Sequence, residues 1–214
     1  MHQNLFNGTF PKEIGNLSNL EELGMAYNPF VPMEIPLEFG FLKKLWYLWM
    51  KGTNLIGEIP ENFNNLSSLQ QFDLSINNLE GPIPSDLFSI ENLTIVYLFK
   101  NHLSNEIPRE INALNLVEVD LSQNNLTGSI PEGFGKLQSL RFLNLFSNQL
   151  TGGDRFTAFA ERFQGFSEQV EWSFAVGIRS LFEARSVRGV GESIPRRIAG
   201  EFVCRRCFTR KKRD

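Results

Sequence analysis

The chain has 214 residues, a formal net charge of -3 and 42% hydrophobic residues, which is enough for one domain or two small ones. Its apolar runs are shorter than the ~18 residues that a membrane-spanning helix needs. Residues 1–4 lack the basic and apolar regions of a secretory signal peptide, and both cysteines lie near the end of the chain, which excludes a disulfide framework elsewhere.

Composition changes near Gly152. Before that residue, asparagine and leucine are abundant and acidic residues outnumber basic ones. After it there is no asparagine, Leu181 is the only leucine, and basic residues outnumber acidic ones. We therefore expect one domain at 1–152 and a separate basic tail at 153–214.

One sequence unit recurs along residues 1–152, with five complete copies and a partial copy at each end. The pattern Leu-x-x-Asn-x-Leu at a period of 23–25 residues is typical of leucine-rich repeats. Thr53 replaces the asparagine once. Elsewhere that residue is Asn4, Asn28, Asn77, Asn101, Asn124 and Asn148.

The unit at 119–131 shows why this spacing predicts a coil. Val119 and Leu121 are two residues apart, so both point to the core from one short strand. Asn124 ends the strand, where its amide can pair with backbone groups that the turn leaves without partners. Leu126 and Ile130 return to the core, where each buried side chain stabilises the fold by roughly 1.5–3 kcal/mol.

A single unit cannot cover its own apolar face, so the units must stack. The expected fold is an α/β leucine-rich-repeat solenoid, with parallel strands on the concave face and short helical or 3-10 turns outside. Neither end of the array has a polar or disulfide-bonded cap. We therefore expect both apolar ends to be exposed.

Residues 4–152 resemble part of the ectodomain of a plant leucine-rich-repeat receptor-like kinase, with the peptide-sensing HAESA-like receptors as the nearest group. The phrases at 16–23 and 124–131, the second ending in Gly-x-Ile-Pro, carry this resemblance. It implies a fragment of an extracellular module that binds a secreted peptide or protein, together with a co-receptor, at the plasma membrane. We expect this chain itself to lack the transmembrane helix and the kinase domain.

The outward-pointing strand residues are the candidate binding site. Aromatic and charged side chains on a rigid concave surface suit an extended peptide, although aromatic side chains on neighbouring strands can also simply stack on one another. Asp73 and Asp120 occupy a position where this repeat commonly has Asp, which indicates a mainly structural role for them. The predicted ligand-binding residues are Tyr47, Trp49, Lys51, Asp73, Tyr97, Phe99, Phe142 and Phe146.

Five Asn-x-Ser/Thr acceptors support an extracellular setting. Asparagine-rich repeats also generate this tripeptide by chance, so both interpretations stay open. The predicted glycosylation sites are Asn7, Asn16, Asn65, Asn92 and Asn125.

The tail at 153–214 gives weaker signals. Cys204 and Cys207 form at most half of a zinc site, and the basic residues 205–213 indicate a solvated end rather than a nucleic-acid-binding segment. We hypothesise a shift of reading frame near Gly152, because translation one base later can restore repeat-like phrases. We expect the tail to be either irregular and disordered or partly helical. The helical alternative follows from the spacing of six residues, which can also be coincidental: Phe156, Phe159, Phe163, Phe166, Val170 and Phe174.

No catalytic constellation is visible, so we expect no enzyme activity, no cofactor and no metal. The glycine-rich loop, lysine and aspartate motifs of a kinase are missing from the sequence. Two alternatives to the receptor fragment remain. One is a cell-wall repeat protein that inhibits a secreted polysaccharide-degrading enzyme, and the other is a non-functional product of a disrupted receptor gene.

Overall fold

The computed structural model describes residues 2–151 and 171–173. Short strands alternate with 3-10 helices along these residues. The 3-10 helices are η1 Lys12–Asn16, η2 Leu37–Phe41, η3 Glu61–Asn65, η4 Leu87–Ser89 and η5 Glu132–Lys136. The strands are β1 Glu22–Gly24, β2 Tyr47–Trp49, β3 Ile56–Gly57, β4 Gln71–Asp73, β5 Asn78–Leu79, β6 Ile95–Tyr97, β7 Glu118–Asp120, β8 Phe142–Asn144 and β9 Glu171–Ser173.

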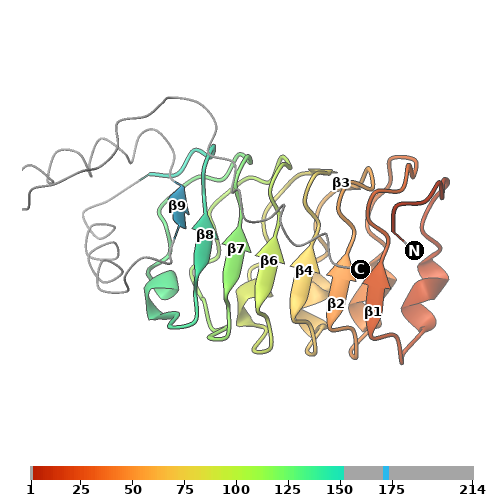
Figure 1. The fold of residues 1–214 in the computed structure, drawn as a ribbon, viewed down its shortest axis with the longest axis horizontal. Helices are drawn as coiled ribbons and strands as arrows, with labels where there is room; N and C mark the ends of the chain where they lie inside the picture. Colours follow the sequence, from red (N-terminus) through yellow and green to blue (C-terminus); the bar gives the residue numbers. More distant parts are fainter. Residues whose placement is uncertain (1, 152–170, 174–214) are drawn as a thin grey trace, which may run out of the picture.

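The main sheet is parallel and follows the order of the repeats, β1-β2-β4-β6-β7-β8-β9 (Figure 1). Equivalent residues of successive repeats lie opposite each other, so that Leu23 pairs with Leu48, which pairs with Phe72. In the main-sheet strands β1, β2, β4, β6, β7 and β8, the middle residue points inward and is buried, while its two neighbours point outward. This alternation follows from the two-residue period of a strand.

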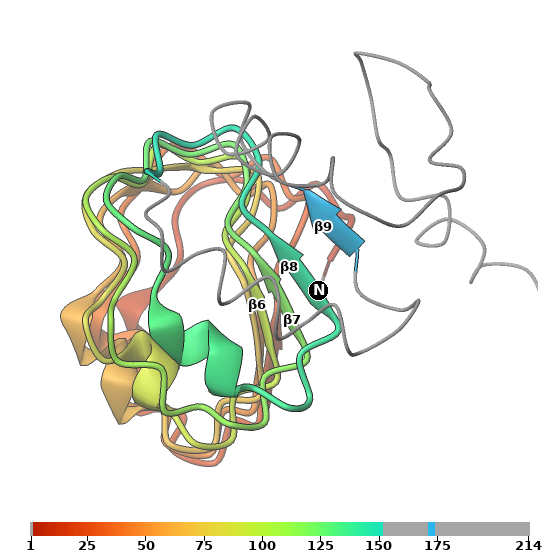
Figure 2. The same ribbon diagram turned by 90° about the vertical axis from the view of Figure 1, so that its left-hand side faces the viewer.

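Each repeat forms one coil, and the coils nearly superimpose when the molecule is viewed along the stack (Figure 2). The main sheet runs along one side of the stack, and the 3-10 helices lie on the opposite side. A second, two-stranded parallel sheet joins β3 to β5. The predicted leucine-rich-repeat solenoid is therefore confirmed.

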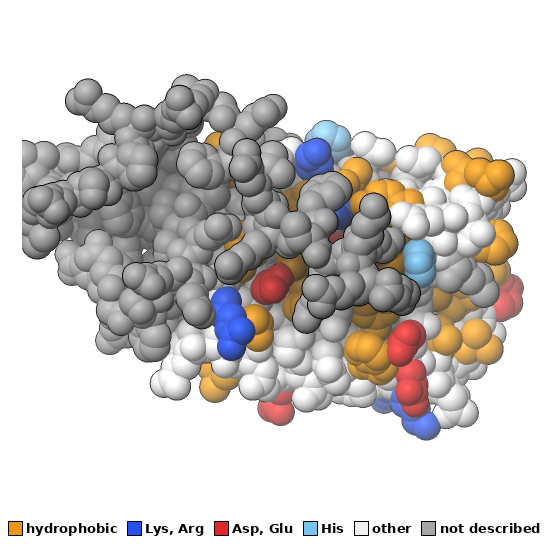
Figure 3. All heavy atoms as spheres, in the orientation of Figure 1, with side chains coloured by type: hydrophobic (Ala, Val, Ile, Leu, Met, Phe, Trp, Pro, Cys, Tyr) orange, Lys and Arg blue, Asp and Glu red, His pale blue; other side chains and the backbone are white. Residues whose placement is uncertain are grey.

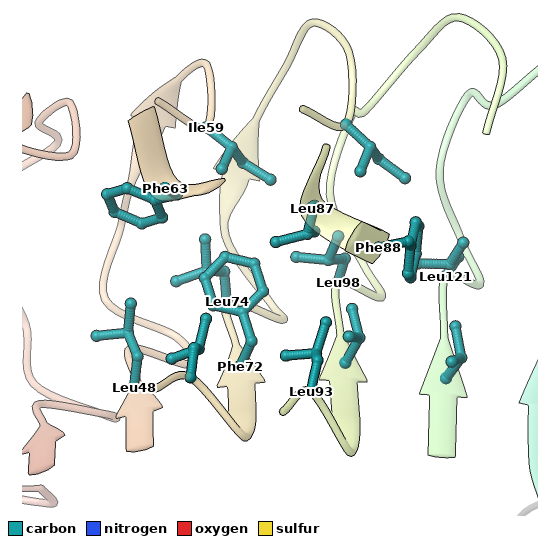
Figure 4. Close-up of a cluster of buried hydrophobic side chains, with 14 of the residues drawn as sticks. Leu48, Ile59, Phe63, Phe72, Leu74, Leu87, Phe88, Leu93, Leu98 and Leu121 are labelled. Carbon is teal, nitrogen blue, oxygen red and sulfur yellow. The ribbon is translucent and has the colours of Figure 1, made fainter. Parts of the chain in front are cut away.

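A continuous apolar core fills the space between the strands and the helices (Figure 4). Leu48, Phe72 and Leu98 enter it from the strand side. Phe63 and Phe88 enter it from η3 and η4, and both rings are fully buried. The core therefore consists of side chains from the strands packed against aromatic side chains from the 3-10 helices.

The repeated asparagines form a buried ladder that joins successive coils. Asn101 donates from Nδ2 to the carbonyl oxygens of Leu98 in its own coil and Leu74 in the preceding coil, both at 3.0 Å. Its Oδ1 accepts from the backbone N–H of Leu79 at 3.1 Å. One side chain thus satisfies backbone groups in two coils, as the sequence predicts.

The two ends of the array differ. Leu5 and Leu17 are strongly exposed at the N-terminal end, in agreement with the expected bare apolar surface. Leu143 and Leu145 are buried, however, and β9 pairs with β8. The expectation of an exposed end was therefore wrong at β8.

The strand β9 also differs from the helix predicted around it, because Glu171–Ser173 is extended and pairs in register with β8. Pairing with the free edge of a parallel sheet outweighs the helical spacing of this segment. The remaining residues of the predicted helix, the two cysteines, the basic end and the proposed frame shift lie outside the described residues.

Candidate functional site

The outward side chains of the main sheet form what we call the strand face, which is turned toward the viewer in Figure 3. Hydrophobic side chains lie beside acidic and basic ones on its visible part. The strand register aligns these side chains in rows that cross the sheet. One row contains Trp49, Asp73, Tyr97, Asp120 and Asn144.

A second row is formed by the residues that lie two positions beyond the end of each strand. Backbone hydrogen bonds between neighbouring coils fix it, such as those from Gly52 N–H to the oxygen of Ser75 and from Ile76 N–H to the oxygen of Phe99. The row contains Lys51, Ser75, Phe99, Ser122 and Phe146. The eight predicted binding residues thus lie on one continuous face.

Aromatic and polar coils alternate across this face. Aromatic rings project outward from the strands β2, β6 and β8. In the coils of β6 and β8, the residue two positions beyond the strand also has an aromatic ring. The coils of β4 and β7 between them carry polar residues instead. We call Asp73 and Ser75 the first polar strip and Asp120 and Ser122 the second polar strip.

The rings pack mainly within a coil. Tyr47 and Trp49 have centroids 6.4 Å apart, and Tyr97 and Phe99 are also 6.4 Å apart. His2 lies 4.9 Å from Trp49, a contact that the sequence did not predict. A polar strip separates these two pairs, although the Tyr27 and Trp49 rings of neighbouring coils also meet edge to face at 6.3 Å.

Lys51 extends across the first polar strip. Its Nζ lies 4.6 Å from the centroid of the Phe99 ring, although Ser75 lies between these residues in the row. It also lies 5.9 Å from the Tyr27 ring. This is the geometry of a cation–π contact.

The two aspartates accept equivalent hydrogen bonds. Asp73 accepts from the hydroxyl and N–H of Ser75 at 2.5 and 2.9 Å, and Asp120 accepts from those of Ser122 at 2.6 and 3.0 Å. Asn144 donates to the other oxygen of Asp120 at 3.2 Å. The structural role expected for these aspartates therefore has a visible basis.

Burial raises the pKa of both Asp73 and Asp120 above the ordinary value. Their serine hydrogen bonds and the positive charge of Lys51 act in the opposite direction but are weaker. Burial also raises the pKa of the Tyr47 hydroxyl, with the charges of Asp73 and Glu22 adding to the effect. Elsewhere on the face, the Tyr97 hydroxyl donates to the Glu118 carboxylate.

All five predicted glycosylation asparagines are exposed. Asn16 and Asn65 end the helices η1 and η3, away from the strand face. None of the five lies in a strand of the main sheet. Glycosylation at these positions stays a prediction.

In residues 2–151 and 171–173, no group of three His, Cys, Asp or Glu side chains is placed to hold a metal ion. Nor do these residues include a helix with the length and apolar character needed to span a membrane. The described strand face combines aromatic rings, the carboxylates of Glu22, Asp73, Glu118 and Asp120, and the ammonium of Lys51.

Comparison with known proteins supports the repeat architecture. The Leucine Rich Repeat family model matches residues 44–66, 68–90 and 115–137. No curated protein sequence matches the chain.

Solved structures of plant receptor ectodomains match the fold. The Arabidopsis receptor kinase HAESA, in complex with the peptide hormone IDA and the co-receptor SERK1, is 41% identical with a TM-score of 0.68, over 70% of this chain and 25% of that one. PEPR1 with AtPEP1 is 34% identical with a TM-score of 0.67, over 70% and 21%. The plant peptide hormone receptor RGFR1 with RGF2 is 31% identical with a TM-score of 0.70, over 81% and 31%. The chain therefore spans about a quarter of the length of these relatives.

Proposed function

We propose that this leucine-rich-repeat solenoid, whose fold matches plant receptor-kinase ectodomains, is a fragment of a HAESA-like receptor that binds an extended secreted peptide across its strand face. The observation that carries the proposal is the alternation of aromatic and polar coils on a rigid parallel sheet. Aromatic rings supply contact area at a small entropic cost, and the polar strips between them supply carboxylates held by buried serines. The ligand-binding residues are those predicted from the sequence, with Trp49 and Phe99 as the central anchors.

Binding is tested by titrating the full chain with the peptides IDA, AtPEP1 and RGF2, each beside a scrambled version. Phe99→Ala should weaken binding by about tenfold or more, because central aromatic residues dominate such interfaces. Phe41→Ala is the matched control, since that ring is 59% exposed but belongs to η2 on the opposite side. Equal losses for the two variants, or no binding of any of the three peptides, would contradict the proposal.

The same proposal places the chain outside the cell, at the plasma membrane of a receptor that works with a co-receptor. Exposed acceptors at all five predicted asparagines agree with this setting. Expression through a eukaryotic secretory pathway, followed by peptide mass spectrometry with and without glycosidase, tests it. Unmodified asparagine at all five positions would count against an extracellular location.

A further inference from the structure

The two polar strips share an aspartate and a serine, but the chain places a cation over the first strip, whereas Asn144 donates to Asp120 and Ser122 in the second. Both contain an Asp-Leu-Ser sequence, at 73–75 and 120–122, and both have the same hydrogen bonds from serine to aspartate. Lys51 crosses the first strip and ends over the Phe99 ring. The first strip therefore shows what kind of group fits this surface, namely an ammonium on an aliphatic stem.

The second strip has matching surroundings. Phe99 precedes Ser122 in its row and Phe146 follows it, and 43% of the Phe146 surface is exposed. Two strand spacings separate these rings, which corresponds to about 9–10 Å along the sheet. That distance accommodates one extended side chain between two aromatic neighbours.

The Asp120 carboxylate of the second strip accepts hydrogen bonds from Ser122 and Asn144, which are both neutral donors. Asp120 is largely buried, and the lysine that interacts with it electrostatically is Lys51, which is held over the first strip. Among the described residues, the outward positions of β6, β7 and β8 and the row beyond them contain no lysine or arginine. A cation placed there would gain from the Asp120 carboxylate and from the faces of Phe99 and Phe146.

We propose that the second polar strip is a subsite for a lysine or arginine side chain of the bound peptide, which enters between Phe99 and Phe146 above Asp120. This inference rests on the proposed peptide-binding function and adds the chemical class of the ligand. A basic side chain is the only ionised peptide side chain that gains from both the carboxylate and the rings. An acidic side chain would be repelled by Asp120.

The probe is a random dodecapeptide library, selected against the full chain and then against its Asp120→Asn variant. Selection on the wild-type chain should enrich lysine or arginine at one position, and the Asp120→Asn variant should lose that enrichment. In a synthetic copy of an enriched peptide, replacing this residue by norleucine should weaken binding by about tenfold. Asp86→Asn is the matched control, because it also removes one negative charge but is exposed beside η4.

A second variant tests the sign of the electrostatic effect. Lys51→Met removes a neighbouring positive charge while keeping the aliphatic length, so it should tighten binding of the basic peptide by about twofold or more. A tenfold loss would mean that Lys51 itself holds an acidic group of the ligand and would overturn the inference. Circular dichroism and the thermal midpoint confirm that each variant is folded.

The outcomes separate the two proposals. Enriched peptides that bind equally well with norleucine, or equally well to the Asp120→Asn chain, would overturn the basic subsite and leave peptide binding intact. A selection that enriches no peptide competing for the strand face would overturn both.

Discussion

At the scale of single residues, the asparagine ladder explains why one side chain recurs in every coil but that of Thr53. Asn124 donates to the carbonyl oxygens of Leu98 and Leu121 at 3.0 Å and accepts from the Leu103 N–H, also at 3.0 Å. The side chain is 7% exposed, so water cannot readily replace these bonds. Both a donor and an acceptor are needed within reach, which an aliphatic or acidic residue of this size cannot supply.

Asn124→Ala should therefore lower the free energy of unfolding by about 2–4 kcal/mol, because it leaves several buried backbone groups without partners. Urea unfolding at neutral pH, analysed at constant m-value, measures this loss. The exposed neighbour Asn125 gives the control, since Asn125→Ala changes the same residue type on the surface. A difference below about 1 kcal/mol between the two variants would contradict a central role for the ladder.

Thr53 shows what the sequence pattern alone does not reveal. Its hydroxyl donates to the Met50 oxygen of its own coil at 2.7 Å. The next residue also bonds to the preceding coil, since Asn54 Nδ2 donates to the Phe30 oxygen at 2.8 Å, but this acceptor lies at a different repeat position from the one that Asn77 and Asn101 use. The sequence predicts where each coil closes, but which side chain supplies the bond depends on the backbone of the neighbouring coil.

The two buried aspartates predict a pH dependence of stability. Burial raises their pKa in the folded chain above the unfolded value of about 3.9. The proton then binds more tightly to the folded state, so this stabilisation is present below pH ~3.9 and is lost as pH rises through the folded pKa values. The double variant Asp73→Asn/Asp120→Asn should therefore gain stability relative to wild type between pH 3 and pH 7.

Urea unfolding of both proteins at pH 3 and pH 7 measures this gain. The variant Asp86→Asn, at an exposed position, serves as the comparison for general charge effects. If the double variant instead lost stability relative to wild type over the same interval, the aspartates would be net stabilising as anions and the assignment would be wrong.

At the scale of elements, the glycine that follows the ladder is required by the coil before it. Gly128 has a φ of +74°, and an added Cβ would lie 2.7 Å from Cγ of Glu106 in the preceding coil. Asn105 occupies the same repeat position with a φ of +65°, but the preceding coil has Pro82 where others have glutamate. The repeat that has Asn105 in place of glycine is therefore also the repeat that packs against Pro82 in place of a glutamate.

Gly128→Ala should cost about 1–3 kcal/mol, from both the left-handed backbone and the contact with Glu106. In a Glu106→Ala background the contact disappears and the cost should fall, leaving only the backbone part. Thermal or urea unfolding of the four proteins completes the double-mutant cycle. An unchanged cost in the second background would show that Glu106 plays no part.

The elements themselves were largely predictable from the sequence because the main-sheet strands share one apolar alternation and every turn except that of Thr53 has the same asparagine. The inward-facing residues of the 3-10 helices were less predictable. Phe63, Phe88 and Phe134 are fully buried, yet they lie in short 3-10 segments without a helical period to mark their inward face. The Lys51–Phe99 contact was also beyond prediction, since it joins two coils across a third.

At the scale of the whole molecule, the strand and helix contacts of the described residues join neighbouring coils, so each coil is stabilised mainly by the coils beside it. The buried leucines differ mainly in how many neighbours they support. Leu98 is fully buried in the middle of the stack, and Leu23 is 7% exposed in the first strand of the sheet. The same substitution should therefore destabilise more coils at Leu98 than at Leu23.

Leu98→Ala should destabilise the chain by about 2–5 kcal/mol and reduce amide protection in the coils on both sides, because it weakens two interfaces at the centre. Leu23→Ala should reduce protection mainly in the first two coils and leave residues 93–145 close to wild type. Hydrogen exchange followed by mass spectrometry measures both patterns. If Leu23→Ala lowered protection evenly from end to end, the array would unfold as one cooperative unit, and nearest-neighbour coupling would not describe it.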